Sequence, residues 1–218
     1  MQRRRLLHAT LAAGLAGQLG LLRSAWAAGR KLAPPGIYRL SGQVQVNGQP
    51  AREGMPIRPG DTVSTGPDSE VIYVIGQDAY LQRDRSTVSL TGDALKNGLR
   101  VLSGKLLAVF AKGDKRIETS TATIGIRGTG CYIEAEANRV YFCLCYGKAE
   151  VASLKNSAHS ETIETRHHDH PVYLHADGSR MMVPAEVVNH RDSELILLES
   201  LVGRVPPFVG QSGYGYNY

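Results

Sequence analysis

The stretch TIGIRGTGCYIEAEANRVYFCLCYG, residues 123–147, holds all three cysteines of this 218-residue chain. Within it, residues 130–136 and 139–146 each place apolar side chains at every second position, which is the pattern of a strand with one buried face. We therefore predict a β-hairpin with these two segments as its strands. The chemistry of the thiols then depends on the number of residues in the turn.

The sequence allows two registers for this hairpin, which differ in the length of the turn. A two-residue turn (137–138) puts the apolar sets of both strands on one face. Cys131 then faces Leu144, and Cys143 and Cys145 point to the opposite side of the sheet. A three-residue turn shifts the register by one residue and brings Cys131 opposite Cys143 or Cys145, close enough for a disulfide bond.

The three thiols have three alternative roles. Export to an oxidising compartment favours a disulfide that involves Cys131, although an odd number leaves one thiol free or paired between chains. Cys143 and Cys145 lie two residues apart and share a face of one strand, a spacing that suits two ligands of a soft metal better than a bond between the sulfurs. Cysteines also serve as small core residues.

A histidine-rich segment supplies the other half of a metal site. Residues 167–170 read His-His-Asp-His, and in an extended chain His168 and His170 share a face. Together with Cys143 and Cys145 they form a tetrahedral set for zinc or another soft transition metal, if the segment folds back onto the hairpin. The alternative interpretation is a solvated polar loop.

The chain around the hairpin is rich in short strand patterns. From 38 to 152, apolar or alternating runs are separated by Gly, Asn, Asp and Pro. The run at 43–46 leads into Asn47 and Gly48, a strong signal for a two-residue hairpin turn. The pattern predicts a mainly β fold, a compact β-sandwich or a rolled β-sheet of short strands.

Residues 153–210 differ in character from the preceding region. Residues 153–170 are polar and rich in histidine, whereas 171–174 and 181–183 predict one last hairpin. The Gly/Tyr-rich end, 211–218, predicts a flexible tail.

One C-terminal α-helix is expected within this region. Asp192 or Ser193 can cap it, and the helical pattern runs to Val202, before a glycine that suits a helix exit. We expect its apolar stripe to pack on the sheet of the same chain. The stripe consists of Leu195, Leu198, Leu201 and Val202.

The first 27 residues have the order of an export signal. Arginines at 3–5 precede an apolar run at 9–22, and Ala25-Trp26-Ala27 has the small-residue pattern of a cleavage site. The arginine pair followed by two leucines is similar to a twin-arginine signal, which exports folded proteins. We expect cleavage near Ala27, a periplasmic product and no stable membrane span after cleavage.

The signal also explains the basic composition. It carries four arginines and no acidic residue, so its removal lowers the formal net charge from +5 to +1. Without a basic surface, nucleic acid is not an expected partner.

The middle of the chain resembles the FecR domain family, named for the regulator of ferric citrate uptake. Three pieces occur in the family's order: GDTVSTG at 60–66, LRVLSGK at 99–105 and GIRGT at 125–129, before a hairpin that ends at Gly147. The resemblance covers about residues 40–152. It implies a periplasmic β-domain, here as a stand-alone exported protein rather than as part of a membrane-anchored anti-sigma regulator.

Six residues carry the motif, and we expect them to shape the backbone. The glycines suit positive φ angles or close strand crossings. Arg127, between two glycines, is interpreted as a buried residue that ties strands together, with an anion ligand as the alternative. The six are Gly60, Asp61, Gly125, Arg127, Gly128 and Thr129.

Two functional hypotheses follow. The first is a non-catalytic module that binds an unknown protein or small ligand of the cell envelope, in signalling or organisation. The second is a periplasmic metal-binding or thiol-redox protein that uses the cysteines and the His-His-Asp-His segment. We expect no enzyme activity, because no nucleophile elbow, phosphate-binding loop or activated thiol motif is evident.

Overall fold

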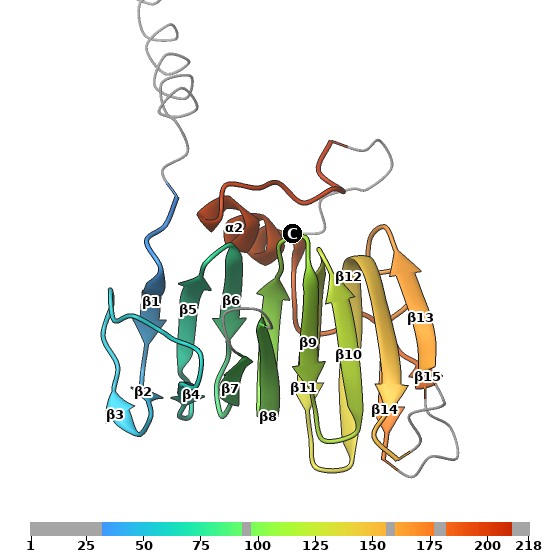
Figure 1. Ribbon diagram of the computed structural model, residues 1–218, viewed down its shortest axis with the longest axis horizontal. Helices are drawn as coiled ribbons and strands as arrows, with labels where there is room; N and C mark the ends of the chain where they lie inside the picture. The colour runs from blue at the N-terminus through green and yellow to red at the C-terminus, as the bar shows by residue number, and fades with distance from the viewer. Residues whose placement is uncertain (1–31, 93–96, 156–159, 177–181, 211–218) are drawn as a thin grey trace, which may run out of the picture. The chain divides into compact units, whose positions relative to one another are not determined.

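The computed structural model describes residues 32–92, 97–155, 160–176 and 182–210. The predicted export segment at 1–27 and the tail at 211–218 lie outside the described residues. The described chain is mainly β, with a short helix near the C-terminus, α2 (Asp192–Leu201) (Figure 1). The predicted fold class is therefore confirmed. Within the described residues, no helix is long and apolar enough to cross a bilayer.

The strands form two sheets joined by two long strands that belong to both, β8 (Asn97–Val109) and β12 (Arg139–Ser153). We call the sheet that packs against α2 the helix-side sheet, and the other the second sheet. The helix-side sheet adds β1 (Gly36–Ser41), β5 (Glu70–Ile75), β6 (Asp78–Gln82), β11 (Gly130–Ala135), β14 (Val172–His175) and β15 (Met182–Pro184). The second sheet adds β2 (Val44–Val46), β3 (Gln49–Pro50), β4 (Thr62–Thr65), β7 (Thr87–Gly92), β9 (Asp114–Glu118), β10 (Ala122–Arg127) and β13 (Ser160–Thr165).

Each long strand has a glycine at the point where it passes from one sheet to the other. Gly104 of β8 has φ +84°, and a Cβ there would lie 2.5 Å from the Ser86 Cα. Gly147 of β12 has φ +98°, and a Cβ there would lie 2.7 Å from the Thr129 side chain. Because only glycine fits both the dihedral angle and the space, these two residues allow one continuous sheet to fold over on itself.

The fold has two apolar layers. The larger core lies between the sheets and includes Cys131, Phe142 and Leu144. A smaller core lies on the outer face of the helix-side sheet, where Tyr132, Cys143, Cys145 and their neighbours are covered by α2 and Phe208. The alternation of side chains along β11 and β12 therefore places both faces of these strands in apolar surroundings.

The predicted helix and its burial are confirmed, with one correction at its start. Leu195, Leu198 and Leu201 pack on the helix-side sheet, where α2 contacts β6 and β8 (Figure 1). The helix is capped by Arg191, not by Asp192 or Ser193; the Glu194 carboxylate accepts the Arg191 backbone N–H at 3.0 Å. The Asp192 carboxylate instead accepts hydrogen bonds from two histidines.

Truncation of the buried stripe of α2 is expected to destabilise the protein. The Leu198 side chain is fully buried, whereas its neighbour Leu197 is 40% exposed. Leu198→Ala should lower the free energy of unfolding by about 2–5 kcal/mol, because it removes buried methyl groups and leaves a cavity. Leu197→Ala is the matched control and should change it by less than about 0.5 kcal/mol. Urea denaturation of both variants measures the difference, and equal losses would contradict the packing described.

The first of the three motif pieces, at 60–66, begins with a tight turn at Gly60 and Asp61. Gly60 has φ +93°, and the Asp61 carboxylate accepts hydrogen bonds from the Asn47 side chain and the Arg58 backbone N–H, both at 2.8 Å, which closes this turn. The predicted tight turn at Asn47 and Gly48 is also present, with positive φ at both residues.

In the GIRGT piece, the expectation of a buried arginine is wrong. The Arg127 side chain is 76% exposed and forms a 3.2 Å ion pair with the exposed Asp114 on the adjacent strand. Its position at the end of β10 points it to solvent, because its neighbour Ile126 faces the core. Gly125 lies within β10, Gly128 has φ +64°, and Thr129 is fully buried.

Candidate metal centre

The hairpin adopts the register of the two-residue turn. Cys131 pairs with Leu144, and the Glu136 backbone N–H donates to the Arg139 carbonyl at 3.0 Å, which leaves residues 137–138 as the turn. Cys131 therefore lies in the core between the sheets, while Cys143 and Cys145 lie on the outer face. The alternative of a disulfide from Cys131 to either of them is wrong for this fold, because the sheet separates the sulfurs. All three cysteines are free thiols.

Cys143 and Cys145 are neighbours on the same face of β12, and both are fully buried. The Cys145 thiol donates a weak hydrogen bond to the Cys143 carbonyl at 3.8 Å. Strand geometry alone accounts for this pair, since residues i and i+2 of a strand point in the same direction.

His168 reaches the thiols from the loop that follows β13. Asp169 shapes this loop: its carboxylate accepts hydrogen bonds from the Thr165 hydroxyl and the Arg166 backbone N–H, both at 2.8 Å. His168 has φ +54°, an uncommon angle for a residue with a side chain, and its backbone N–H donates to the Cys145 carbonyl at 3.0 Å. As a result, the His168 Nδ1 lies 3.3 Å from the Cys143 Sγ.

His190 completes the group from the connection that leads into α2. Its ring stacks on Tyr132, with 4.6 Å between the ring centroids, and its Nε2 lies 3.0 Å from the His168 Nδ1. The sequence interpretation missed His190, which lies 22 residues beyond His168. The segment around it has no regularly spaced cysteines or histidines that would indicate a metal ligand. Its only sequence signal is a single histidine directly before a helix start.

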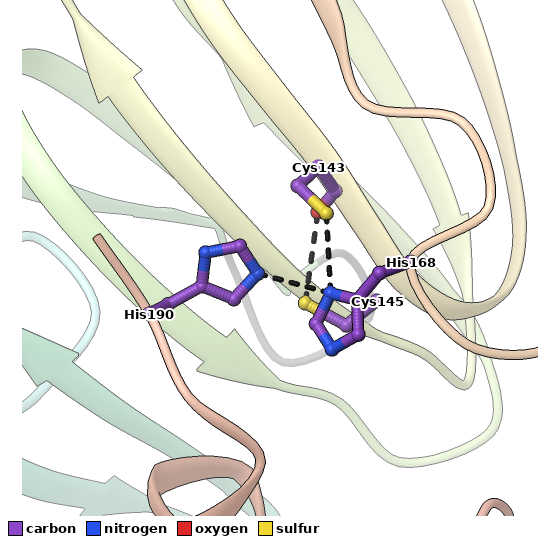
Figure 2. Close-up of side chains that lie close together, drawn as sticks. All are labelled: Cys143, Cys145, His168 and His190. Carbon is purple, nitrogen blue, oxygen red and sulfur yellow. Dashed lines mark hydrogen bonds between the residues drawn. The ribbon is translucent and has the colours of Figure 1, made fainter. Parts of the chain in front are cut away.

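Four ligand atoms converge in this way. The Sγ atoms of Cys143 and Cys145 and one ring nitrogen each of His168 and His190 all lie within 4.8 Å of one another (Figure 2). In a tetrahedral zinc site with ordinary bond lengths, neighbouring ligand atoms are separated by about 3.3–3.8 Å. The distances from the His168 Nδ1 to the His190 Nε2, 3.0 Å, and to the Cys143 Sγ, 3.3 Å, are close to this spacing.

His170 is not part of the group, and this corrects the predicted set. It is exposed, whereas His168 turns inward. The prediction assumed an extended segment, in which the two histidines share a face. The turn closed by Asp169 and the left-handed conformation of His168 break that alternation.

The outer nitrogens of both rings already have hydrogen-bond acceptors. The His190 Nδ1 lies 2.6 Å from the Val188 carbonyl, and the His168 Nε2 lies 3.1 Å from the Asp192 carboxylate. Carbonyl and carboxylate oxygens only accept, so each of these nitrogens carries a hydrogen. In neutral imidazoles the facing nitrogens, His168 Nδ1 and His190 Nε2, are then both lone-pair acceptors. Two lone pairs at 3.0 Å require a proton or a metal cation between them.

The electrostatics of the thiols follow from the same contacts. The neighbouring Cys145 thiol, and then the rings of His168 and His190, lower the pKa of the Cys143 thiol well below its ordinary value, although burial opposes this shift. Burial, followed by the neighbouring Cys143, raises the pKa of Cys145 well above its ordinary value. Burial opposes protonation of His168, but Cys143 and then Asp192 raise its pKa. Without a metal, the site therefore favours a Cys143 thiolate beside a protonated His168.

Replacement of His190 and His170 distinguishes the observed set from the predicted one. His190→Ala should weaken binding of Zn²⁺ or Co²⁺ by at least about 100-fold, because one of four ligands is lost. His170→Ala should leave the affinity within about twofold, because the exposed side chain contributes no ligand. Competition against a chromogenic chelator measures both. A larger effect from His170 would show that the loop folds differently around a metal.

Comparison with known proteins adds little to this picture. No protein-family model matches the chain, and no curated protein matches it. Two solved structures from Parabacteroides distasonis, both described as candidate anti-sigma factors, are similar with a TM-score of 0.48 each. The first is 8% identical over 57% of this chain and 59% of the other; the second is 10% identical over 64% and 73%. The chain thus spans less than two thirds of the first structure's own length, and likeness at this level carries no functional argument.

Proposed function

We propose that this protein is an exported, non-catalytic module of the cell envelope that binds one soft transition-metal ion, with Zn²⁺ as the expected ion. The ligands are Cys143, Cys145, His168 and His190. The observation that supports this most directly is the meeting of two imidazole nitrogens whose opposite nitrogens already donate hydrogen bonds. Two buried thiols complete the set. Thiolate and imidazole are the ligands that Zn²⁺ prefers in structural sites.

The donor set favours a structural role for the metal over a catalytic one. Catalytic zinc sites keep one position for water or substrate, whereas four protein ligands fill a tetrahedral ion. The four residues come from β12, from the loop after β13 and from the connection before α2. A metal bound here would join three segments that are distant in the sequence, and so would help to hold α2 on the helix-side sheet.

The outer partners of the histidines also fit a metal centre. Ligating histidines commonly donate their second ring N–H to a carboxylate or a backbone carbonyl, which fixes the ring and its tautomer. His168 has Asp192 in this role, and His190 has the Val188 carbonyl.

Titration of the full chain with Co²⁺ tests the proposal. The chain is purified under reducing conditions, freed of metal with a chelator, and titrated anaerobically. We expect saturation at one equivalent, with the strong visible bands of tetrahedral Co²⁺ and a sulfur-to-cobalt charge-transfer band in the near ultraviolet. One equivalent of Zn²⁺ should abolish both signals. A spectrum of hexaaquo Co²⁺ throughout the titration would refute the metal centre.

The export part of the proposal rests on residues 1–27 alone. Fractionation of bacterial cells that express the full chain should place in the periplasm a product that begins near Ala28. An intact chain that stays in the cytosol would contradict it. The ordered FecR-like motifs support a role in envelope signalling or organisation, with an unknown protein or small ligand as partner.

A further inference from the structure

The two thiols of the proposed metal set are closed to solvent. Both thiols have no exposed surface, and His190 is 8% exposed. A metal ion that enters from water therefore meets less buried side chains before it meets the sulfurs.

A second group of ligand atoms lies on the solvent side of His168. The His167 Nε2 lies 2.9 Å from both carboxylate oxygens of Asp192, and the His168 Nε2 lies 3.1 Å from one of them. The side chains of His167, His168 and Asp192 are 13%, 10% and 14% exposed. Solvent thus reaches this group, unlike the thiols.

We propose that His167, His168 and Asp192 form an outer metal site that receives a divalent ion and passes it to the buried set. The transfer role of this site rests on the proposed function, whereas metal binding at the outer site itself is measured separately. Two imidazole nitrogens and a carboxylate suit Zn²⁺, Co²⁺ or Ni²⁺, with waters in the remaining positions. Adjacent ligand atoms around such an ion are about 3 Å apart, which the observed spacing already matches.

His168 links the two sites because it belongs to both groups. Its Nε2 faces outward to Asp192, and its Nδ1 faces inward to Cys143 and His190. An ion in the outer site takes the lone pair of Nε2, so the ring proton is then on Nδ1. When the ion moves inward, Nδ1 gives up its proton and becomes a ligand, Nε2 takes up a proton and donates it to Asp192 again, and the thiol protons pass to solvent. The outer site therefore loses its His168 ligand when the inner set is loaded. The two sites are therefore occupied in succession, not together.

Binding at the outer site is tested with the inner thiols removed. The full-length Cys143→Ser/Cys145→Ser variant is titrated with Co²⁺ alone by calorimetry and absorption. We expect one equivalent bound more weakly than in the wild type, without any sulfur-to-cobalt band. Adding His167→Ala should abolish this binding, and adding His170→Ala, an exposed neighbour, should not. Absence of binding in the double variant, or binding that survives His167→Ala, would overturn the outer site.

The transfer role is tested by the rate of loading. With limiting Co²⁺, the sulfur-to-cobalt band should rise about tenfold more slowly in His167→Ala than in His170→Ala, because the incoming ion then lacks one of the two imidazole ligands of the outer site. Equal rates would overturn the transfer. If that band is absent even in the wild type, the buried centre fails, while the titration of the double variant still decides the outer site. Far-ultraviolet circular dichroism of each variant confirms that the β fold is intact.

Discussion

The Cys143→Ser variant is expected to lose tight metal binding. Structural zinc sites with four ligands bind with about 10–16 kcal/mol, so loss of one thiolate should remove about 3–4 kcal/mol, or about 100- to 1,000-fold in affinity. A serine hydroxyl stays protonated at neutral pH and is a poor ligand for a soft ion. Competition titration of Zn²⁺ against a chelator measures the loss, and the sulfur-to-cobalt band should fall in intensity.

Cys131→Ser is the matched control for this variant. It removes a thiol from the same hairpin, one that faces the core between the sheets. Its metal affinity should stay within about twofold of the wild type, although burial of a hydroxyl should cost about 1–3 kcal/mol of stability. Equal loss of binding in both variants would show that the register described for β11 and β12 does not hold in solution.

Removal of the metal is expected to lower the stability of the whole β domain. An ion that binds only the folded state adds about 4 kcal/mol when its free concentration exceeds the dissociation constant 1,000-fold. For a domain of this size, that corresponds to a rise in Tm of about 8–16 °C. Thermal unfolding with excess Zn²⁺ and with a chelator measures the difference.

The His190→Ala variant is the control for this effect. It lacks one ligand, so the chelator should change its Tm far less than that of the wild type. The α2 segment also has contacts that need no metal, including the buried Leu195 and Leu198 and the hydrogen bond from the Tyr146 hydroxyl to Glu199. We therefore expect the metal-free protein to be folded but to have a lower Tm. A wild-type Tm that is the same with excess Zn²⁺ and with the chelator would contradict the proposed function.

Much of the fold could be predicted because it depends on local patterns. Alternation along 130–136 and 139–146 was sufficient to say which thiols share a face once the turn length is known. The sequence alone allows a turn of two or three residues, and packing decides between them: only the two-residue turn buries both apolar sets in the core between the sheets. The apolar stripe of α2 could also be predicted from its local periodicity. The exact start of the helix could not, because Asp192, a predicted cap, forms hydrogen bonds with the histidines of the loop after β13.

By itself, the sequence determined the β class, the C-terminal helix and its buried face, and the shared face of Cys143 and Cys145. Periodicity of side chains along a strand or helix is a local property, so residue order suffices for these features. Only the tertiary structure decided that His190, not His170, meets His168. That choice depends on the path of the connection before α2 across the sheet and on a left-handed residue in the loop, and both are set by contacts between segments distant in the chain.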